Sequence, residues 1–142
     1  MNLPAYLLKK LQKVQNYAAR VVKKLRVRDS VTRHLKDLHW LPVEYRIKFK
    51  VALLVYKSLN NLAPGYLAQT IQKYQPTRNL RSTSKNLLVR KRFSKRYGHR
   101  AFSVAAPEIW NDLPDQVKNS ESMQKFKTNL KTHFFSKAFP QT

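Results

Sequence analysis

The side chains that could support catalysis or bind a metal ion are few and scattered along this chain. Seven carboxylates occur among 142 residues, and no two of them are adjacent. Two-metal phosphoryl transfer needs carboxylates that converge on both cations. The closest pair, Asp112 and Asp115, flanks Pro114 and is more typical of turn and cap positions. The full set of acids is Asp29, Asp37, Glu44, Glu108, Asp112, Asp115 and Glu121.

The histidines, serines and glycines lack the contexts that catalysis requires. His34 and His39 are five residues apart, off the i,i+4 spacing that places two metal ligands on one helix face. Ser103 has no Gly-x-Ser-x-Gly context. The chain has no cysteine and only two glycines, which excludes disulfides, zinc ribbons, thiol catalysis and Gly-rich phosphate loops. We therefore expect a non-catalytic chain with no metal site, no cofactor and no small-molecule substrate.

The net charge points to a polyanionic partner. Twenty-nine Lys and Arg residues against seven acids give a formal charge of +22, and self-repulsion opposes compaction unless anions screen it. Nucleic acid is the first candidate. An anionic membrane is a weaker one, because the basic first helix has no Trp and the longest apolar run, Val51 to Tyr56, is too short to cross a bilayer. We expect RNA or DNA as the partner, and no membrane.

Two groups of basic residues are the candidates for phosphate contact. Arg side chains bind phosphate bidentately and also stack on bases, and no acid occurs between Tyr45 and Pro107. Tyr74, Phe93 and Tyr97 could stack on single-stranded bases, although core packing is the preferred explanation for each of them taken alone. The candidates in the loop-like stretch are Arg78, Arg81, Arg90, Lys91, Arg92, Lys95, Arg96 and Arg100, and those near the N-terminus are Lys9, Lys13, Arg20 and Lys24.

The hydrophobic pattern predicts an all-α fold in one domain over residues 1–142. Spacings of three and four predict five or six helices around a central hydrophobic helix, Pro42 to Leu59, with one extended basic loop. The helical part covers residues 3–74, the basic loop 75–100 and a C-terminal helical part 101–139. The first helix carries an apolar stripe of Leu7, Leu11, Val14, Ala18 and Val21.

Local signals add finer expectations. Asp29 and Ser30 resemble an N-cap for a short helix, and Ser120 or Ser122 caps the last helix. We expect two short helical turns joined at Pro107. The apolar run 87–89 predicts either a short strand or an extended docking segment.

The order of several short blocks resembles a known family. The blocks are 11–16 (LQKVQN), 38–43 (LHWLPV), 56–59 (YKSL), 62–67 (LAPGYL), 97–107 (YGHRAFSVAAP) and 110–114 (WNDLP). Together they are similar to the region that follows the polymerase domain in reverse transcriptases of non-LTR (LINE-type) retrotransposons, of the chicken-repeat and jockey-like kinds. The resemblance covers about residues 3–139.

This resemblance implies a nucleic-acid-binding accessory role in an RNA-directed DNA polymerase. The family's paired-aspartate motif and endonuclease acids are absent, so no catalytic residue carries over. The resemblance further implies an orphan or truncated copy of such a protein, acting in the nucleus or cytoplasm, with the nucleus favoured. The alternative is a structural scaffold that docks on the reverse-transcriptase thumb through the apolar stripe of the first helix.

Overall fold

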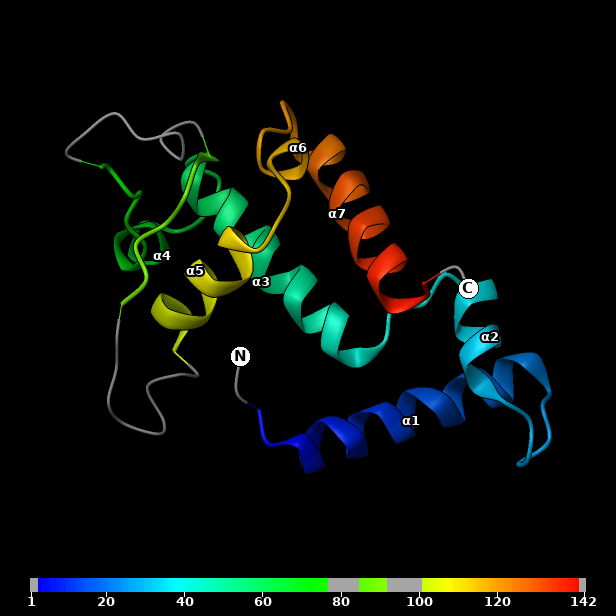
Figure 1. Ribbon diagram of the computed structural model, residues 1–142. Helices are drawn as coiled ribbons and strands as arrows, with labels where there is room; N and C mark the ends of the chain where they lie inside the picture. Colours follow the sequence, from blue (N-terminus) through cyan, green and yellow to red (C-terminus); the bar gives the residue numbers. More distant parts are fainter. Residues whose placement is uncertain (1–2, 77–84, 92–100, 141–142) are drawn as a thin grey trace. The chain divides into compact units, whose positions relative to one another are not determined.

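The computed structural model describes residues 3–76, 85–91 and 101–140, and this part of the chain is all-α, as the sequence predicts (Figure 1). It contains seven helices. They are α1 (Ala5–Lys23), α2 (Val31–Asp37), α3 (Val43–Leu59), α4 (Gly65–Thr70), α5 (Phe102–Asn111), α6 (Asp115–Lys118) and α7 (Met123–Ala138). The helix beyond the expected five or six is the four-residue α6, which is too short to produce a hydrophobic period.

Internal contacts divide the chain into two units. The central unit is Lys48–Lys131, and the terminal unit combines Leu3–Ile47 with Thr132–Thr142. The first residues of α3 and the last residues of α7 belong to the terminal unit, and the rest of both helices belongs to the central unit. The single domain predicted from the length stays a prediction.

The terminal unit has a small core that α1, α2 and the end of α7 provide. Ala19, Val31, Leu35 and Phe139 are buried there, with Trp40 and Phe135 packed against them. The rings of Phe135 and Phe139 lie 4.9 Å apart. Helix α2 follows Ser30 as predicted, but the Ser30 side chain makes no cap hydrogen bond.

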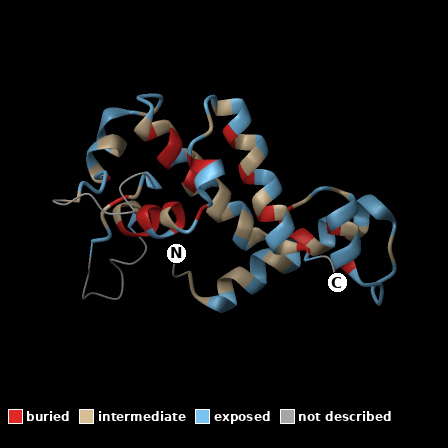
Figure 2. Cartoon of the chain, turned by 45° about the horizontal axis from the view of Figure 1, so that its top comes forward, coloured by how far each residue is buried: buried red, intermediate tan, exposed pale blue. Residues whose placement is uncertain are grey.

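The central unit has a larger, aromatic core. The ring of Phe126 in α7 stacks on Tyr56 of α3, with 4.2 Å between centroids, and lies 6.0 Å from Trp110 of α5. Trp110 and Phe126 are almost completely buried. Figure 2 shows the concentration of buried residues along α5, whereas α1 is mostly exposed or intermediate.

The region around Pro107 differs from the sequence prediction. Residues 102–111 form one continuous helix, α5, rather than two turns joined at Pro107. Proline in a helix interior removes one hydrogen bond and crowds the preceding turn. Five other α5 residues are buried beside it, namely Val104, Ala105, Ala106, Ile109 and Trp110. Their packing stabilises the helix against the proline.

Several local predictions are confirmed or adjusted. Ser122 caps α7, because its Oγ accepts a 3.2 Å hydrogen bond from the Lys125 N–H. Helix α4 ends at Thr70, so Ile71 and Tyr74 lie outside it. The predicted extended segment is present: Lys73 and Leu88 form an antiparallel β-bridge. Two backbone hydrogen bonds flank the bridge, Tyr74 N–H to Leu87 C=O at 2.8 Å and Val89 N–H to Gln72 C=O at 2.9 Å.

Candidate nucleic-acid interface

Helix α1 presents three distinct faces. Its buried face contains Gln15 and Ala19. The second face carries three of the predicted cations, Lys9, Lys13 and Arg20, at spacings of four and seven, within an arc of about 40° and over about 17 Å of the helix. The fourth, Lys24, follows the helix as its C-cap in the left-handed conformation, with φ 51°. The row consists of Lys9, Lys13, Arg20 and Lys24. We call it the basic row.

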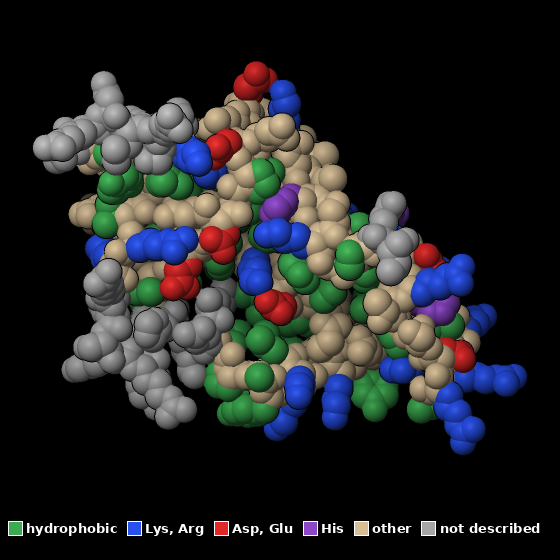
Figure 3. All heavy atoms as spheres, in the orientation of Figure 1, with side chains coloured by type: hydrophobic (Ala, Val, Ile, Leu, Met, Phe, Trp, Pro, Cys, Tyr) green, Lys and Arg blue, Asp and Glu red, His purple; other side chains and the backbone are tan. Residues whose placement is uncertain are grey.

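The third face of α1 is apolar and exposed. Val14 is 67% exposed and Val21 is 78% exposed, Leu11 and Ala18 are also exposed, and Leu7 is half-buried. Among the described residues, most of the apolar stripe of the first helix therefore does not face a core. Figure 3 shows Lys and Arg side chains projecting along α1 beside hydrophobic ones.

The basic row has no acidic partner in the part of the chain that the structure describes. No acid occurs in the first turn of α1, or anywhere before Asp29. In this part, acids pair with lysine or arginine elsewhere, as in Arg90–Asp112, Lys118–Asp115 and Lys125–Glu121. Lys9, Lys13 and Lys24 are exposed to solvent. Their charges are consequently available to an external anion.

Arg20 is held differently from the three lysines. It is half-buried, and its Nη2 donates a 3.4 Å hydrogen bond to the carbonyl oxygen of Asp29. Its Nε is buried with no hydrogen-bond partner. The loop after α1 thus fixes the guanidinium in place, which lowers the entropy cost of a contact with phosphate.

The extended segment 85–91 is fastened to α5 and α6 by side chains. Asn111 makes two hydrogen bonds to Leu88: its Oδ1 accepts from the Leu88 N–H and its Nδ2 donates to the Leu88 carbonyl, both at 2.9 Å. Trp110 Nε1 donates to the Asn86 carbonyl at 2.8 Å, and Lys118 Nζ donates to the Lys85 carbonyl at 3.0 Å. We call these three residues, Trp110, Asn111 and Lys118, the segment clamp.

The clamp places two of the predicted cations at the end of a fixed segment. Arg90 and Lys91 are exposed. Arg90 Nη2 lies 3.4 Å from Asp112 Oδ1, and both side chains are largely solvent-exposed. Exposed ion pairs contribute only ~0–1 kcal/mol, so Arg90 can exchange this partner for a phosphate.

The other predicted loop residues, Arg78, Arg81, Arg92, Lys95, Arg96 and Arg100, lie outside the described residues, as do Phe93 and Tyr97. Tyr74 is described, and its side chain is 43% exposed. Core packing therefore does not account for this aromatic residue. The structure brings together the four cations of the basic row, and separately Arg90 with Lys91.

The acids and histidines of the described residues do not gather into a metal-binding group. In the described ranges no group of three or more His, Cys, Asp or Glu could hold a metal ion. The hydrogen bond from Lys118 lowers the pKa of Asp115 below its ordinary value of 3.8. Burial, and then the charge of Lys137, lowers the pKa of His133, so its imidazole is neutral at physiological pH. Contacts within the fold therefore account for the pKa shifts of Asp115 and His133.

Sequence reasoning missed the polar side chains that build these surfaces. Asn111 and Lys118 were not singled out, although they position segment 85–91. Gln12 and Gln15 were seen only as parts of a block, although they connect α1 to the start of α3. One sequence signal could have identified Gln15: it lies on the side of α1 that carries neither the apolar stripe nor the basic row.

Comparison of the chain with protein-family models, with curated proteins and with solved structures finds no match. Among the described residues, no helix combines the length and the apolar character that crossing a membrane requires.

Proposed function

We propose that the chain is a non-catalytic nucleic-acid-binding module that holds RNA or DNA through the phosphate backbone. The observation that supports this best is the basic row on α1. Three of its cations share one face of α1 and the fourth is the C-cap residue, the helix contains no acid, and no acid among the described residues forms an ion pair with the row. A charge of +22 on the whole chain adds a long-range attraction to polyanions.

Contacts of this kind provide affinity without sequence choice. Lys and Arg that neutralise phosphates release condensed counterions, which makes binding strong at low salt and weak at high salt. Such contacts position a protein on a strand and carry no base information by themselves. The proposed role is therefore to hold a strand for another activity. Together with the block order, this favours an accessory part of a LINE-type RNA-directed DNA polymerase that acts on nucleic acid in the nucleus.

The test is the salt dependence of binding to a single-stranded RNA and a DNA duplex. If the four cations of the basic row each neutralise one phosphate, the logarithm of the binding constant should fall linearly with the logarithm of the salt concentration. The slope should be about −3 or steeper, since each contact contributes about −0.7 to −0.9. Affinity that stays flat between low and high salt contradicts the proposal.

A second candidate function rests on the exposed apolar stripe of α1. A stripe in which Val14 and Val21 are two-thirds or more exposed resembles a surface that another protein covers. In this reading the chain is a scaffold that packs on the reverse-transcriptase thumb of a parent protein. The two functions use different faces of the same helix, so they are compatible and can be tested separately.

A further inference from the structure

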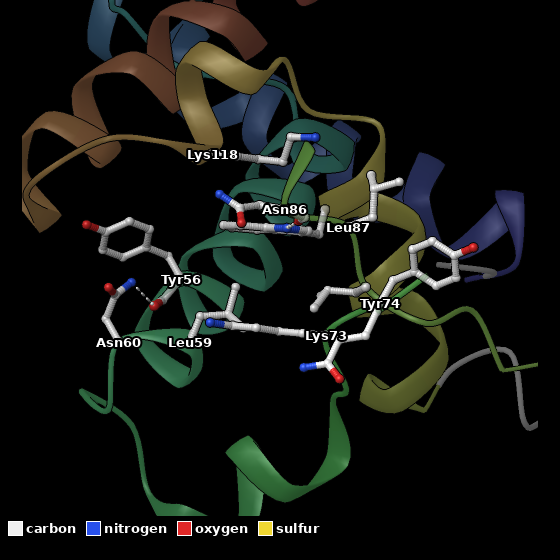
Figure 4. A pocket seen from close by; sticks show the side chains of 11 residues that line it. Tyr56, Leu59, Asn60, Lys73, Tyr74, Asn86, Leu87 and Lys118 are labelled. Carbon is white, nitrogen blue, oxygen red and sulfur yellow. Dashed lines mark hydrogen bonds between the residues drawn. The ribbon is translucent and has the colours of Figure 1, made fainter. Parts of the chain in front are cut away.

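A cavity of about 220 Å³ lies in the central unit, between the end of α3 and the two bridged segments. Its lining comes from α3, α5, α6 and residues 73–75 and 86–88. Figure 4 shows Lys73 and Leu59 on one side, Asn86 and Lys118 on the other, and Tyr56 and Tyr74 at opposite ends. The cavity is smaller than the ~300–1,000 Å³ of a pocket for a drug-sized ligand. Its volume therefore suits one planar ring system.

The lining combines three chemical features that a single nucleotide can use together. Tyr74, whose side chain is 43% exposed, offers a ring face for stacking, whereas the other two aromatic lining residues, Tyr56 and Trp110, are buried in the core. Amides from Asn60, Gln75 and Asn86 offer both donors and acceptors. Lys73 adds an exposed cation that forms no ion pair among the described residues. An apolar ligand would leave the amides unpaired, and a free phosphate would leave the aromatic faces unused.

The polar groups of the cavity are partly fixed before any ligand binds. Asn86 has a positive φ of 46°, its carbonyl accepts from Trp110, and its Nδ2 donates to Asn119 Oδ1 at 2.7 Å. Asn60 Nδ2 donates to the Tyr56 carbonyl at 2.8 Å. Each amide uses one donor in these bonds, so its oxygen and second N–H are available to the edge of a base. Preorganisation of this kind reduces the entropy cost of binding.

Charge in the cavity favours an anionic ligand. None of the lining residues is an acid, and two are lysines. The Lys118 side chain is only 2% exposed, and its Nζ lies 2.8 Å from Asp115 Oδ1, which neutralises its charge. Lys118 therefore lines the cavity without offering its charge to a ligand. Lys73 lies at the exposed side and can receive a phosphate.

We propose that this cavity accepts one unstacked base of a single-stranded nucleic acid, with the adjoining phosphate at Lys73. The proposal rests on the nucleic-acid binding proposed above and adds to it a preference for single strands. A duplex keeps its bases stacked inside, whereas unpaired bases can splay into protein pockets and stack on aromatic side chains.

The experiment compares a short oligothymidine with an abasic strand of equal length and charge, at one salt concentration, with the full chain. We expect the base-bearing strand to bind about tenfold more tightly, the size of one stacked base. Tyr74→Leu should reduce this ratio to near one and leave the abasic affinity unchanged. Tyr66→Leu is the matched control, because Tyr66 is exposed on α4 and does not line the cavity. It should retain the ratio.

Each outcome separates the two proposals. Equal binding of both strands by the wild-type chain overturns the base site and leaves phosphate binding intact. Failure to bind either strand contradicts the proposed function itself. A retained ratio in Tyr74→Leu overturns the location. If Tyr74→Leu does not fold, Leu59→Phe, which enlarges a side chain that lines the cavity, should abolish the ratio in its place. A ratio that survives Leu59→Phe also overturns the location.

Discussion

The side-chain amide of Gln15 donates a 2.8 Å hydrogen bond to the carbonyl oxygen of Leu41 in a buried position. Gln12, one turn earlier, accepts a 2.9 Å bond from the Val43 N–H at the start of α3 and donates to Gln15 Oε1 at 3.1 Å. Glutamines, rather than the leucine and valine stripe, thus join α1 to the start of α3. This choice leaves the apolar stripe and the basic row on the solvent-facing sides of α1.

Gln15→Ala should destabilise the chain by about 1–3 kcal/mol, because it leaves a buried carbonyl oxygen without its donor. Chemical denaturation followed by circular dichroism measures this change. Gln124→Ala is the matched control, since Gln124 is exposed on α7, and it should shift the free energy of unfolding by less than ~0.5 kcal/mol. Equal effects of the two substitutions would show that the Gln15 bond adds no specific stability.

Asn111→Ala should lower the free energy of unfolding more than Asp112→Asn, a substitution at the next residue. Leu88 is 2% exposed, and without Asn111 both its N–H and its C=O lose the side-chain partner. We expect a loss of ~2–4 kcal/mol, since each unsatisfied buried group costs ~1–3 kcal/mol. Asp112→Asn removes only an exposed ion pair, worth ~0–1 kcal/mol. Denaturation midpoints of the two variants test this order. A larger loss in Asp112→Asn would mean that the segment clamp does not hold residues 85–91.

The Lys118–Asp115 pair should give stability a component that disappears in acid. Its hydrogen bond lowers the pKa of Asp115 in the folded chain below 3.8. The stabilisation is therefore complete above pH 3.8 and is lost as the pH falls through the lowered folded value. Asp115→Asn should destabilise the chain well above pH 3.8 and match the wild type well below it. In a Lys118→Met background the same substitution should lose most of its pH-dependent effect, because the remaining charge that lowers the pKa of Asp115, that of Lys85, is the smallest of the causes. An undiminished effect would contradict the assignment to Lys118.

The sequence predicted where the helices lie along the chain better than it predicted which face of each helix is buried. Apolar spacing places α1, α2, α3 and α7 correctly, because periodicity reports which residues share a side of a helix. It does not report which side is buried when a helix has both an apolar stripe and a polar face with hydrogen-bonding capacity. In α3 the apolar Leu54 is 37% exposed, whereas the polar Ser58 is buried and its hydroxyl donates a hydrogen bond to the Leu54 carbonyl.

The candidate sites also differ in how far local sequence patterns could predict them. Most of the basic row was predictable, because the spacing of Lys9, Lys13 and Arg20 alone puts them on one helix face. The left-handed C-cap conformation of Lys24 was not. The cavity was not, because it depends on the bridge between Lys73 and Leu88 and on side-chain bonds from α5 and α6. Such contacts join residues more than ten positions apart, and local pattern carries no signal for them.

Neutralising the basic row should weaken nucleic-acid binding and flatten its salt dependence. In the triple variant Lys9→Gln, Lys13→Gln, Lys24→Gln, the slope of log K against log salt should decrease in magnitude by about 2–3, one unit or slightly less per lost contact. The matched control replaces three lysines of α7, Lys127, Lys131 and Lys137, and removes the same charge. A loss confined to the first variant assigns the contacts to α1. Equal losses would show that net charge alone determines binding.

The apolar stripe should respond to salt in the opposite sense. Contacts between exposed Val14 and Val21 and another apolar surface strengthen as salt screens the positive charges that surround them. If the stripe is a docking face, the isolated chain should self-associate with rising salt in sedimentation velocity, while its affinity for nucleic acid falls. Val14→Ser with Val21→Ser should abolish the association and spare nucleic-acid binding. A monodisperse wild-type monomer at every salt concentration would remove the support for the scaffold function and leave the basic row unaffected.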